Sequence, residues 1–317
     1  MAATGLGDPA VLFFGLGLAA AAIRSNLEVP APVSRFLSLY LLMALGLKGG
    51  FALAHSGLSA EVGRSLLAAV VLAVAIPAAT YALLARRFSP FDAAAIAATY
   101  GSVSAVTFIT ATNHLDRLSV DYGGHMAAAM ALMESPAIVI AVLLANVARN
   151  REGSGGANRG LARALHESFT DGAQILLLGA LAIGMATGAA GEAAMKPFTG
   201  DVFRGMLSLF LLDMGLAAAR SARELRSAPW WLTLYAVAAP LVHATLAYTL
   251  GRGLGLTGGN LALLMVLAAS ASYIAVPAAI RHAIPEATPS LYLGLSLGLT
   301  FPFNILFGIP LYAAIAL

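Results

Sequence analysis

Long apolar runs separated by short polar stretches dominate the chain. A helix needs roughly 20 apolar residues to cross the hydrocarbon layer of a membrane. Dividing the sequence at charges, glycines and prolines predicts ten membrane-spanning helices in two sets of five. The predicted spans are residues 9–23, 36–54, 65–85, 92–112 and 125–147, followed by 171–190, 202–219, 229–250, 260–280 and 290–316. The pattern therefore predicts an all-α integral membrane protein.

The composition excludes most alternatives to a membrane protein. Of the 317 residues, 60% are hydrophobic and only 10% are charged, whereas soluble domains carry about 25% charged residues. The chain has no cysteine, so disulfides, thiolate metal sites and cysteine nucleophiles are excluded. Nothing favours nucleic-acid binding, because the basic residues lie in short loops without interleaved aromatic residues. Residues 1–8 lack the basic start of a secretory signal, so the first apolar run is expected to be a retained span.

A polar, flexible segment at residues 149–170 separates the two sets of spans and is predicted to be a cytoplasmic linker. Positively charged loops stay in the cytoplasm, and this placement puts 12 basic residues inside and six outside. The inside set is Arg24, Arg35, Arg86, Arg87, Arg149, Arg151, Arg159, Arg163, Arg220, Arg223, Arg226 and Arg281. The outside set is Lys48, Arg64, Arg117, Lys196, Arg204 and Arg252. Both termini are then predicted to lie outside, and the second set of five must be inverted relative to the first.

Internal matches at an offset of about 166 to 170 residues support this inversion. The segment 37–42 is echoed by 207–212, the segment 101–104 by 269–272, and Pro136 by Pro302. We therefore divide the chain into a first inverted repeat (1–148), the linker (149–170) and a second inverted repeat (171–317). Inverted repeats are the building plan of many secondary transporters, whose sites lie at the repeat interface near the membrane midplane.

Small hydroxyl residues interrupt spans 4 and 9 at matching positions. The candidate anion-binding residues are Gly101, Ser102, Ser104, Ser270, Ala271 and Ser272. Glycine and proline weaken a helix locally, and serine is a preferred N-cap, so each span is predicted to be two half-helices. A half-helix N-terminus offers free N–H groups and about half a positive charge, which suits a small anion. The alternative is that small residues only let helices pack closely.

Two acidic residues are predicted inside spans, at a cost of about 2.5 to 3.5 kcal/mol each on insertion scales. Glu134 precedes Pro136, which frees a backbone carbonyl, and with Ser104 and Thr107 it would supply hard oxygen ligands for Na⁺. A proton site and a neutral, hydrogen-bonded glutamate are the alternatives. Asp213 and Asn304 are weaker sodium candidates. Asp213 lacks a repeat counterpart, and a gate or a subunit contact is its alternative role. Asn304 is most simply explained by helix packing.

The sequence gives little support for an enzyme. No HExxH motif or carboxylate cluster indicates a metal enzyme. The turn at 101–105 faintly resembles a serine-nucleophile turn, but no strand precedes it and no base accompanies it. We therefore expect a secondary active transporter, without an organic cofactor and with Na⁺ as coupling ion.

Five segments make the chain resemble the cyanobacterial-type sodium-dependent bicarbonate symporter family. They are Phe36–Leu42 with Gly46–Gly50, Tyr100–Phe108, Met133–Pro136, Phe210–Gly215 and Ala271–Ala279. The resemblance spans nearly the whole chain. It implies a fold related to sodium/proton antiporters and bile-acid symporters, in which spans 3–5 and 8–10 form a mobile core with discontinuous helices 4 and 9. Spans 1, 2, 6 and 7 would form a scaffold that trimerises.

The same resemblance implies Na⁺-coupled uptake of bicarbonate or a similar small anion by an elevator-like motion, in the inner membrane of a bacterium. It also implies inhibition by a small PII-like regulatory protein at the cytoplasmic face. Three alternatives stay open: a symporter of another small anion, a Na⁺/H⁺ antiporter of related fold, and a membrane receptor or scaffold without transport. Bicarbonate-free Na⁺/H⁺ exchange would indicate the antiporter, and ligand-stabilised melting without uptake would indicate the receptor.

Overall fold

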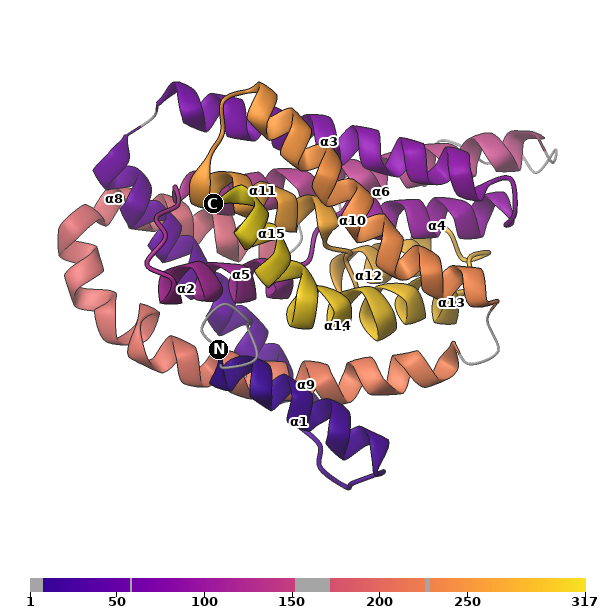
Figure 1. Ribbon diagram of the computed structural model, residues 1–317, viewed down its shortest axis with the longest axis horizontal. Helices are drawn as coiled ribbons and strands as arrows, with labels where there is room; N and C mark the ends of the chain where they lie inside the picture. Colours follow the sequence, from indigo (N-terminus) through magenta and orange to yellow (C-terminus); the bar gives the residue numbers. More distant parts are fainter. Residues whose placement is uncertain (1–7, 58, 152–171, 226–228) are drawn as a thin grey trace.

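Every regular element that the computed structural model describes is a helix (Figure 1). The described residues are 8–57, 59–151, 172–225 and 229–317. The first half contains α1 (Pro9–Ala22), α2 (Ala31–Ser56), α3 (Ala60–Leu84), α4 (Pro90–Gly101), α5 (Ala105–Arg117) and α6 (His125–Arg151). The second half contains α8 (Gly172–Thr199), α9 (Asp201–Glu224), α10 (Trp230–Gly253), α11 (Gly258–Ala269), α12 (Ala275–Ala283), α13 (Pro289–Leu293), η2 (Gly294–Thr300), α14 (Phe301–Phe303), η3 (Asn304–Gly308) and α15 (Ile309–Ala316).

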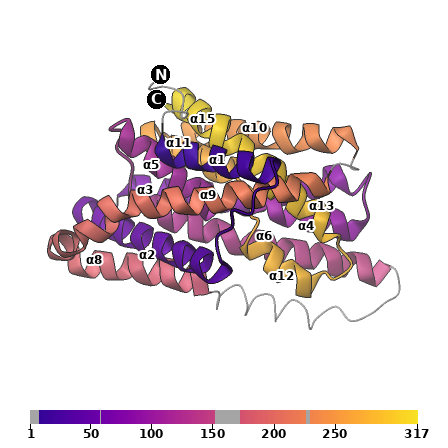
Figure 2. The ribbon, with the colours of Figure 1, turned by 90° about the horizontal axis from the view of Figure 1, so that it is seen from below.

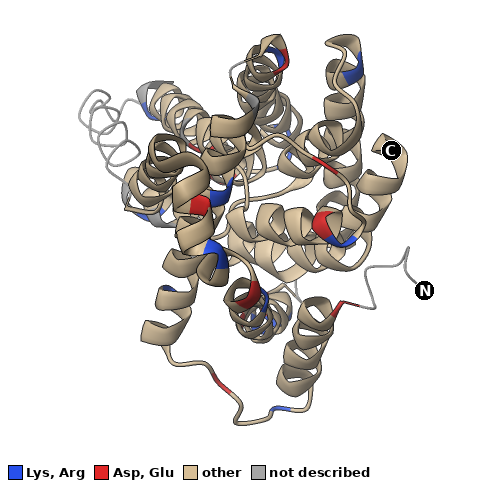
Figure 3. Ribbon diagram, turned by 90° about the vertical axis from the view of Figure 1, so that its left-hand side faces the viewer, with Lys and Arg blue, Asp and Glu red and all other residues tan. Residues whose placement is uncertain are grey.

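The described helices confirm a multi-pass membrane protein. Eight stretches are long and apolar enough to cross a membrane, and α1 and α11 are shorter apolar helices. Figure 3 shows Lys, Arg, Asp and Glu as isolated patches on a ribbon that is otherwise tan. The number of crossings stays a prediction, as do the repeat boundaries. Most of the predicted linker lies outside the described residues, although α6 extends into it as far as Arg151.

Four predicted spans depart from a simple helix. The chain leaves the helix between α4 and α5 and again between α11 and α12, as the small residues predicted. The last span contains two π-helical segments, η2 and η3, a geometry that is frequent at functional sites and that we did not predict. The sixth span was predicted to end at residue 190, but α8 continues to Thr199 through a kink at Gly188, whose φ is 52°.

Helices α1, α2, α8 and α9 pack together, and we call them the four-helix group. Helix α1 lies against α9, and α2 lies against α8 (Figures 1 and 2). Both contacts bring backbones together at glycine. A Cβ on Gly17 would lie 2.3 Å from the Leu212 carbonyl oxygen, and a Cβ on Gly50 would lie 2.2 Å from the Leu181 carbonyl oxygen. Only glycine permits helix axes to approach this closely.

The remaining helices, α3–α6 and α10–α15, form what we call the broken-helix group. Helix α3 packs on α4 and α6, while α10 packs on α11 and α11 on α15. The half-helices α4 and α11 are almost wholly buried among these neighbours. The two interruptions of the chain therefore lie deep inside this group, and both are held by packed helices on several sides.

Candidate functional site

The interrupted stretches of the two broken helices lie side by side. The backbone N–H of Ser104 donates to the Ser270 hydroxyl at 3.0 Å. The backbone N–H of Ser272 donates to the Thr99 carbonyl at 2.8 Å. Because a buried N–H or C=O without a partner is costly, these bonds satisfy groups that the helix breaks expose. They also fix the two interruptions against each other.

Ser104 is the N-cap of α5, and Ser272 lies two residues before Ile274, the N-cap of α12. Both serines accept a hydrogen bond from the first turn of the following half-helix, and we call both of these N-termini capped. The Ser104 hydroxyl oxygen accepts from the backbone N–H of Thr107 at 3.1 Å and from the Thr107 hydroxyl at 3.0 Å. The Ser272 hydroxyl oxygen accepts from the backbone N–H of Val276 at 3.3 Å. An accepting hydroxyl still has its own hydrogen to donate. Both serines are nearly fully buried, with 4% and 2% exposure, so this hydrogen is available inside the protein.

The two capped N-termini face a shared cavity of about 60 Å³, which we call the central cavity. This volume holds about two water molecules, or one small polyatomic ion. Its lining from the broken-helix group is Val103, Ser104, Ala105, Val106, Ile109, Met130, Glu134, Ser272, Tyr273, Ile274 and Ala275. The four-helix group closes it with Ser38, Leu41, Leu42, Ala173, Leu177 and Phe210. The central cavity therefore lies between the two helix groups.

Glu134 brings a carboxylate to this cavity from α6. Its backbone carbonyl accepts from the Ser102 hydroxyl at 3.3 Å, which ties α6 to the interruption of the first broken helix. Its carboxylate oxygen Oε2 accepts from the Gln174 side-chain amide at 3.1 Å. Gln174 lies on α8, so this hydrogen bond joins the broken-helix group to the four-helix group.

Comparison with known families decides the class of protein. A family described as the Na⁺-dependent bicarbonate transporter superfamily matches residues 9–317. The chain belongs to this superfamily. Comparison with curated proteins gives no match. Membership confirms the resemblance drawn from the sequence, and it confirms a transporter rather than an enzyme, with Na⁺ as the ion on which transport depends.

In this member of the superfamily, the predicted anion residues divide into two kinds. Ser104 and Ser272 line the central cavity, whereas Gly101, Ser102, Ser270 and Ala271 are not among its lining residues. Ser270 donates to the Leu267 carbonyl at 2.8 Å, and its oxygen accepts from the backbone N–H of Ser104 where the two interrupted stretches meet. Gly101 allows close packing, since a Cβ there would lie 2.6 Å from the Pro77 ring. Gly101, Ser102 and Ser270 therefore support the site by packing and hydrogen bonding and do not line the cavity.

The predicted sodium residues are similarly divided. Thr107 is buried directly behind Ser104, and Glu134 lines the cavity. Asn304 donates to the Ala269 carbonyl at 2.8 Å and accepts from the Tyr312 hydroxyl at 3.1 Å, so it supports the end of α11. Asp213 accepts a hydrogen bond from Ser34 within the four-helix group, and it is not among the residues that line the cavity.

Sequence reasoning missed Gln174 and Tyr273. The Tyr273 hydroxyl is buried beside Ser104 and makes no hydrogen bond of normal geometry with the described residues. A buried hydroxyl without a partner costs free energy unless a ligand satisfies it. The signal for Gln174 was a lone amide near the start of an apolar run. Its partner is 40 residues away in the sequence, so no local pattern reveals their contact.

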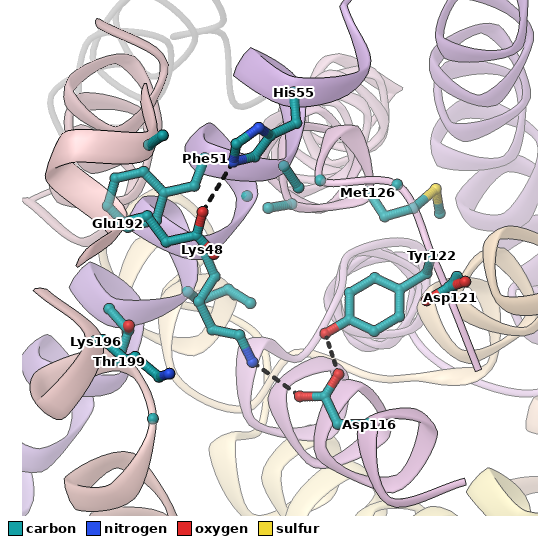
Figure 4. A pocket seen from close by; sticks show the side chains of 18 of the residues that line it. Lys48, Phe51, His55, Asp116, Asp121, Tyr122, Met126, Glu192, Lys196 and Thr199 are labelled. Atoms are coloured by element: carbon teal, nitrogen blue, oxygen red, sulfur yellow. Dashed lines mark hydrogen bonds and ion pairs between the residues drawn. The ribbon is translucent and has the colours of Figure 1, made fainter. Parts of the chain in front are cut away.

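A second cavity, which we call the vestibule, has a volume of about 770 Å³ and lies toward the far end of α5 (Figure 4). The charged groups along its wall are Lys48, His55, Asp116, Asp121, Glu192 and Lys196. Lys48 pairs with Asp116 at 2.8 Å, and His55 lies 2.9 Å from Glu192. The Tyr122 hydroxyl donates to Asp116 at 2.9 Å. Burial, together with the Asp116 carboxylate, raises the pKa of Tyr122, so this hydroxyl keeps its proton.

Proposed function

We propose that this protein is a symporter that uses a Na⁺ gradient to import bicarbonate or a closely similar small anion. The observation that carries the proposal is the central cavity between two capped helix N-termini. The first N–H groups of a helix have no partner within the helix, and α5 and α12 each aim such groups at the cavity. Helix N-termini with free N–H groups bind anions, so no lysine or arginine is needed within the membrane.

The hydrogen-bonding pattern favours an anion over other ligands at Ser104 and Ser272. The two hydrogen bonds from Thr107 occupy both lone pairs of the Ser104 oxygen, so its remaining capacity is to donate. The unpartnered hydroxyl of Tyr273 supplies another donor. A drug-sized organic substrate needs about 300 to 1,000 Å³, whereas this cavity has about 60 Å³. A small oxyanion with several acceptor atoms fits both the size and the donors.

We assign the Na⁺ ion to Glu134 and Thr107, next to the anion. Ser104, the third predicted sodium ligand, is left out because its oxygen already accepts two hydrogen bonds. The Thr107 hydroxyl donates its hydrogen to Ser104, so its oxygen keeps lone pairs for a cation. Carboxylate and hydroxyl oxygens are ligands that hard cations prefer. The ion would neutralise Glu134 and add positive charge beside the anion. Each ligand must then raise the affinity of the other by the same factor, and one Na⁺ per bicarbonate would carry no net charge.

Transport is assigned to an elevator-like movement of the broken-helix group against the four-helix group. The central cavity lies on the boundary between them, so relative movement would carry the site from one side to the other. Packing also supports two inverted repeats, because α1 pairs with α9 and α2 with α8, an exchange that repeat symmetry requires. The start of α1 and helix α15 both adjoin α5, which agrees with termini on one side of the membrane.

The proposal includes a homotrimer in a bacterial inner membrane with both termini outside. The four-helix group presents apolar side chains outward, among them Leu12, Leu16, Ile175 and Ile183, and such a face suits lipid or a second copy. A PII-like regulator at the cytoplasmic face is part of the same proposal. Most of its expected contact region, the linker, lies outside the described residues.

Uptake of labelled bicarbonate into vesicles, with and without an inward Na⁺ gradient, tests the proposed function. We expect accumulation only with the gradient, and Glu134→Gln should remove the dependence on Na⁺. Asp213→Asn is the matched control, because it neutralises another acid within a span that does not line the cavity. Sodium-independent accumulation by the unaltered protein would refute coupling. Na⁺/H⁺ exchange without bicarbonate would identify an antiporter instead.

A further inference from the structure

Helix α5 connects the central cavity to the vestibule. Its first turn carries the Ser104 cap, and its last turn ends at Arg117. With a rise of 1.5 Å per residue, the 13 residues of α5 span about 20 Å. A helix of this length moves as a rigid rod, so whatever holds its last turn also holds the N-terminus that faces the anion.

The last turn of α5 is tied to the start of α1 through Asp8. The Asp8 carboxylate caps α1 by accepting from the backbone N–H of Ala10 at 2.9 Å. It also accepts from the Asn113 amide at 2.7 Å and pairs with Arg117 at 2.9 Å. The Asp8 side chain is only 7% exposed. A buried carboxylate depends strongly on its partners, because an uncompensated buried charge is costly.

The same turn is tied to α2 through Lys48. The Lys48 ammonium group pairs with Asp116 at 2.8 Å, and Tyr122 donates to the other oxygen of the same carboxylate. Figure 4 shows this chain of contacts crossing the vestibule from α2 to the end of α5. Lys48 also lies over the Phe203 ring, 5.4 Å from its centroid, which fixes the lysine on the side of the four-helix group.

Both contacts run between the two helix groups, unlike the other two ion pairs among the described residues. His55 and Glu192 both belong to the four-helix group, and Arg149 and Glu286 both belong to the broken-helix group. The consecutive residues Asp116 and Arg117 instead pair with α2 and with the start of α1. These two residues have opposite charges, so each reaches a different partner. The last turn of α5 is thus fastened to two helices of the other group.

We propose that the Lys48–Asp116 and Asp8–Arg117 ion pairs are positioning contacts of the transport cycle, which hold the broken-helix group in the arrangement seen here and must break before it moves. The proposal rests on the alternating movement proposed above. It adds the residues that set the balance between arrangements. Because Lys48 and Asp116 are each about one-third exposed to the vestibule, their pair can exchange with water at low cost, as a contact broken in every cycle requires.

Distances between spin labels on the two groups test this proposal. The chain has no native cysteine, so Ala54→Cys on α2 and Gly253→Cys at the end of α10 give two label sites directly. A Cβ at Gly253 would meet open space. Pulsed electron-paramagnetic-resonance measurements in lipid vesicles then report how much protein occupies each arrangement. These distance measurements require neither bicarbonate nor sodium-driven uptake, so they are independent of the transport assay.

The arrangement reached after the broken-helix group has moved gives a second label-to-label distance. Lys48→Met should raise the population with this second distance about two- to fivefold, as expected for a partly exposed ion pair. Arg117→Gln should raise it on the order of tenfold, because the buried Asp8 loses its charged partner while its cap on α1 is kept. Exchanging the charges, with Lys48→Asp and Asp116→Lys together, should restore the original distribution. A merely structural role for these residues would not be rescued in this way.

Glu192→Gln is the matched control, since it removes an ion pair from the same cavity but within one helix group. We expect its distance distribution to equal that of the unaltered protein. Unchanged distributions in both Lys48→Met and Arg117→Gln, at normal melting temperatures, would overturn the proposal, and so would a charge exchange that fails to rescue. If sodium-driven uptake persists in that case, only this proposal falls. If the distances shift as expected but the unaltered protein shows no sodium-driven uptake, the proposed function is refuted instead.

Discussion

The crossing of α1 and α9 offers a sharp test of how the four-helix group is built. Gly17 and Gly215 lie against each other there, and a Cβ on Gly17 would sit 2.3 Å from the Leu212 carbonyl oxygen. Ordinary van der Waals contact begins near 3.4 Å. Gly17→Ala therefore requires the two helices to separate by about 1 Å. Gly15 is on the same helix, and a Cβ there would have nothing within 4 Å.

Both alanines gain the same helix propensity, up to about 1 kcal/mol over glycine. Overpacking a close contact costs about 1 to 3 kcal/mol, and only Gly17→Ala incurs this cost. The two variants should therefore differ by about 1 to 3 kcal/mol in the free energy of unfolding. With a shift of about 2 °C per kcal/mol for a chain of this size, Gly17→Ala should melt about 2 to 6 °C below Gly15→Ala.

Tryptophan fluorescence during thermal unfolding in detergent measures this difference. Gly15→Ala should melt at or above the temperature of the unaltered protein, because it adds propensity without a clash. Equal melting temperatures for the two alanine variants would refute the close crossing. They would mean that α1 and α9 do not touch at the backbone, so the four-helix group would lose one of its two glycine contacts.

Three further predictions concern the site and its supports. Ser104→Ala removes the cap of α5 and leaves the Thr107 hydroxyl without its acceptor, so the free energy of unfolding measured in melting assays should fall by about 2 to 4 kcal/mol. Calorimetry should show weaker bicarbonate binding by the same variant. Gln174→Leu should change the Na⁺ concentration for half-maximal uptake while melting stays within a few degrees; an unaltered Na⁺ response would contradict a role at the sodium site. Hydrogen bonds from Arg149 lower the pKa of Glu286, so this contact stabilises the fold above the ordinary glutamate pKa and is lost as pH falls through the lowered value. Between pH 6 and pH 3, the melting temperature should therefore fall less steeply with falling pH for Arg149→Gln than for the unaltered protein. An equal slope for the two proteins would contradict the contact.

The two helix interruptions show how far local sequence reasoning reached. Glycine, serine and the half-helix pattern at 101–104 and 270–272 predicted both breaks, because backbone freedom and capping are properties of a few adjacent residues. The same reasoning assigned all four serines to the anion site. Ser104 and Ser272 line the cavity, while Ser102 bonds to α6 and Ser270 accepts from Ser104 where the two interrupted stretches meet. That division depends on which way each hydroxyl faces after the two stretches meet.

The amino-acid sequence alone determined that this is a multi-pass membrane protein built of apolar helices, since the length and charge of each run depend only on neighbouring residues. Tertiary structure decided which polar residues meet: Glu134 with Gln174, Asp8 with Arg117, and Lys48 with Asp116. These partners are 40 to 109 residues apart along the chain. Packing of whole helices, which no local pattern encodes, brings them within hydrogen-bonding distance.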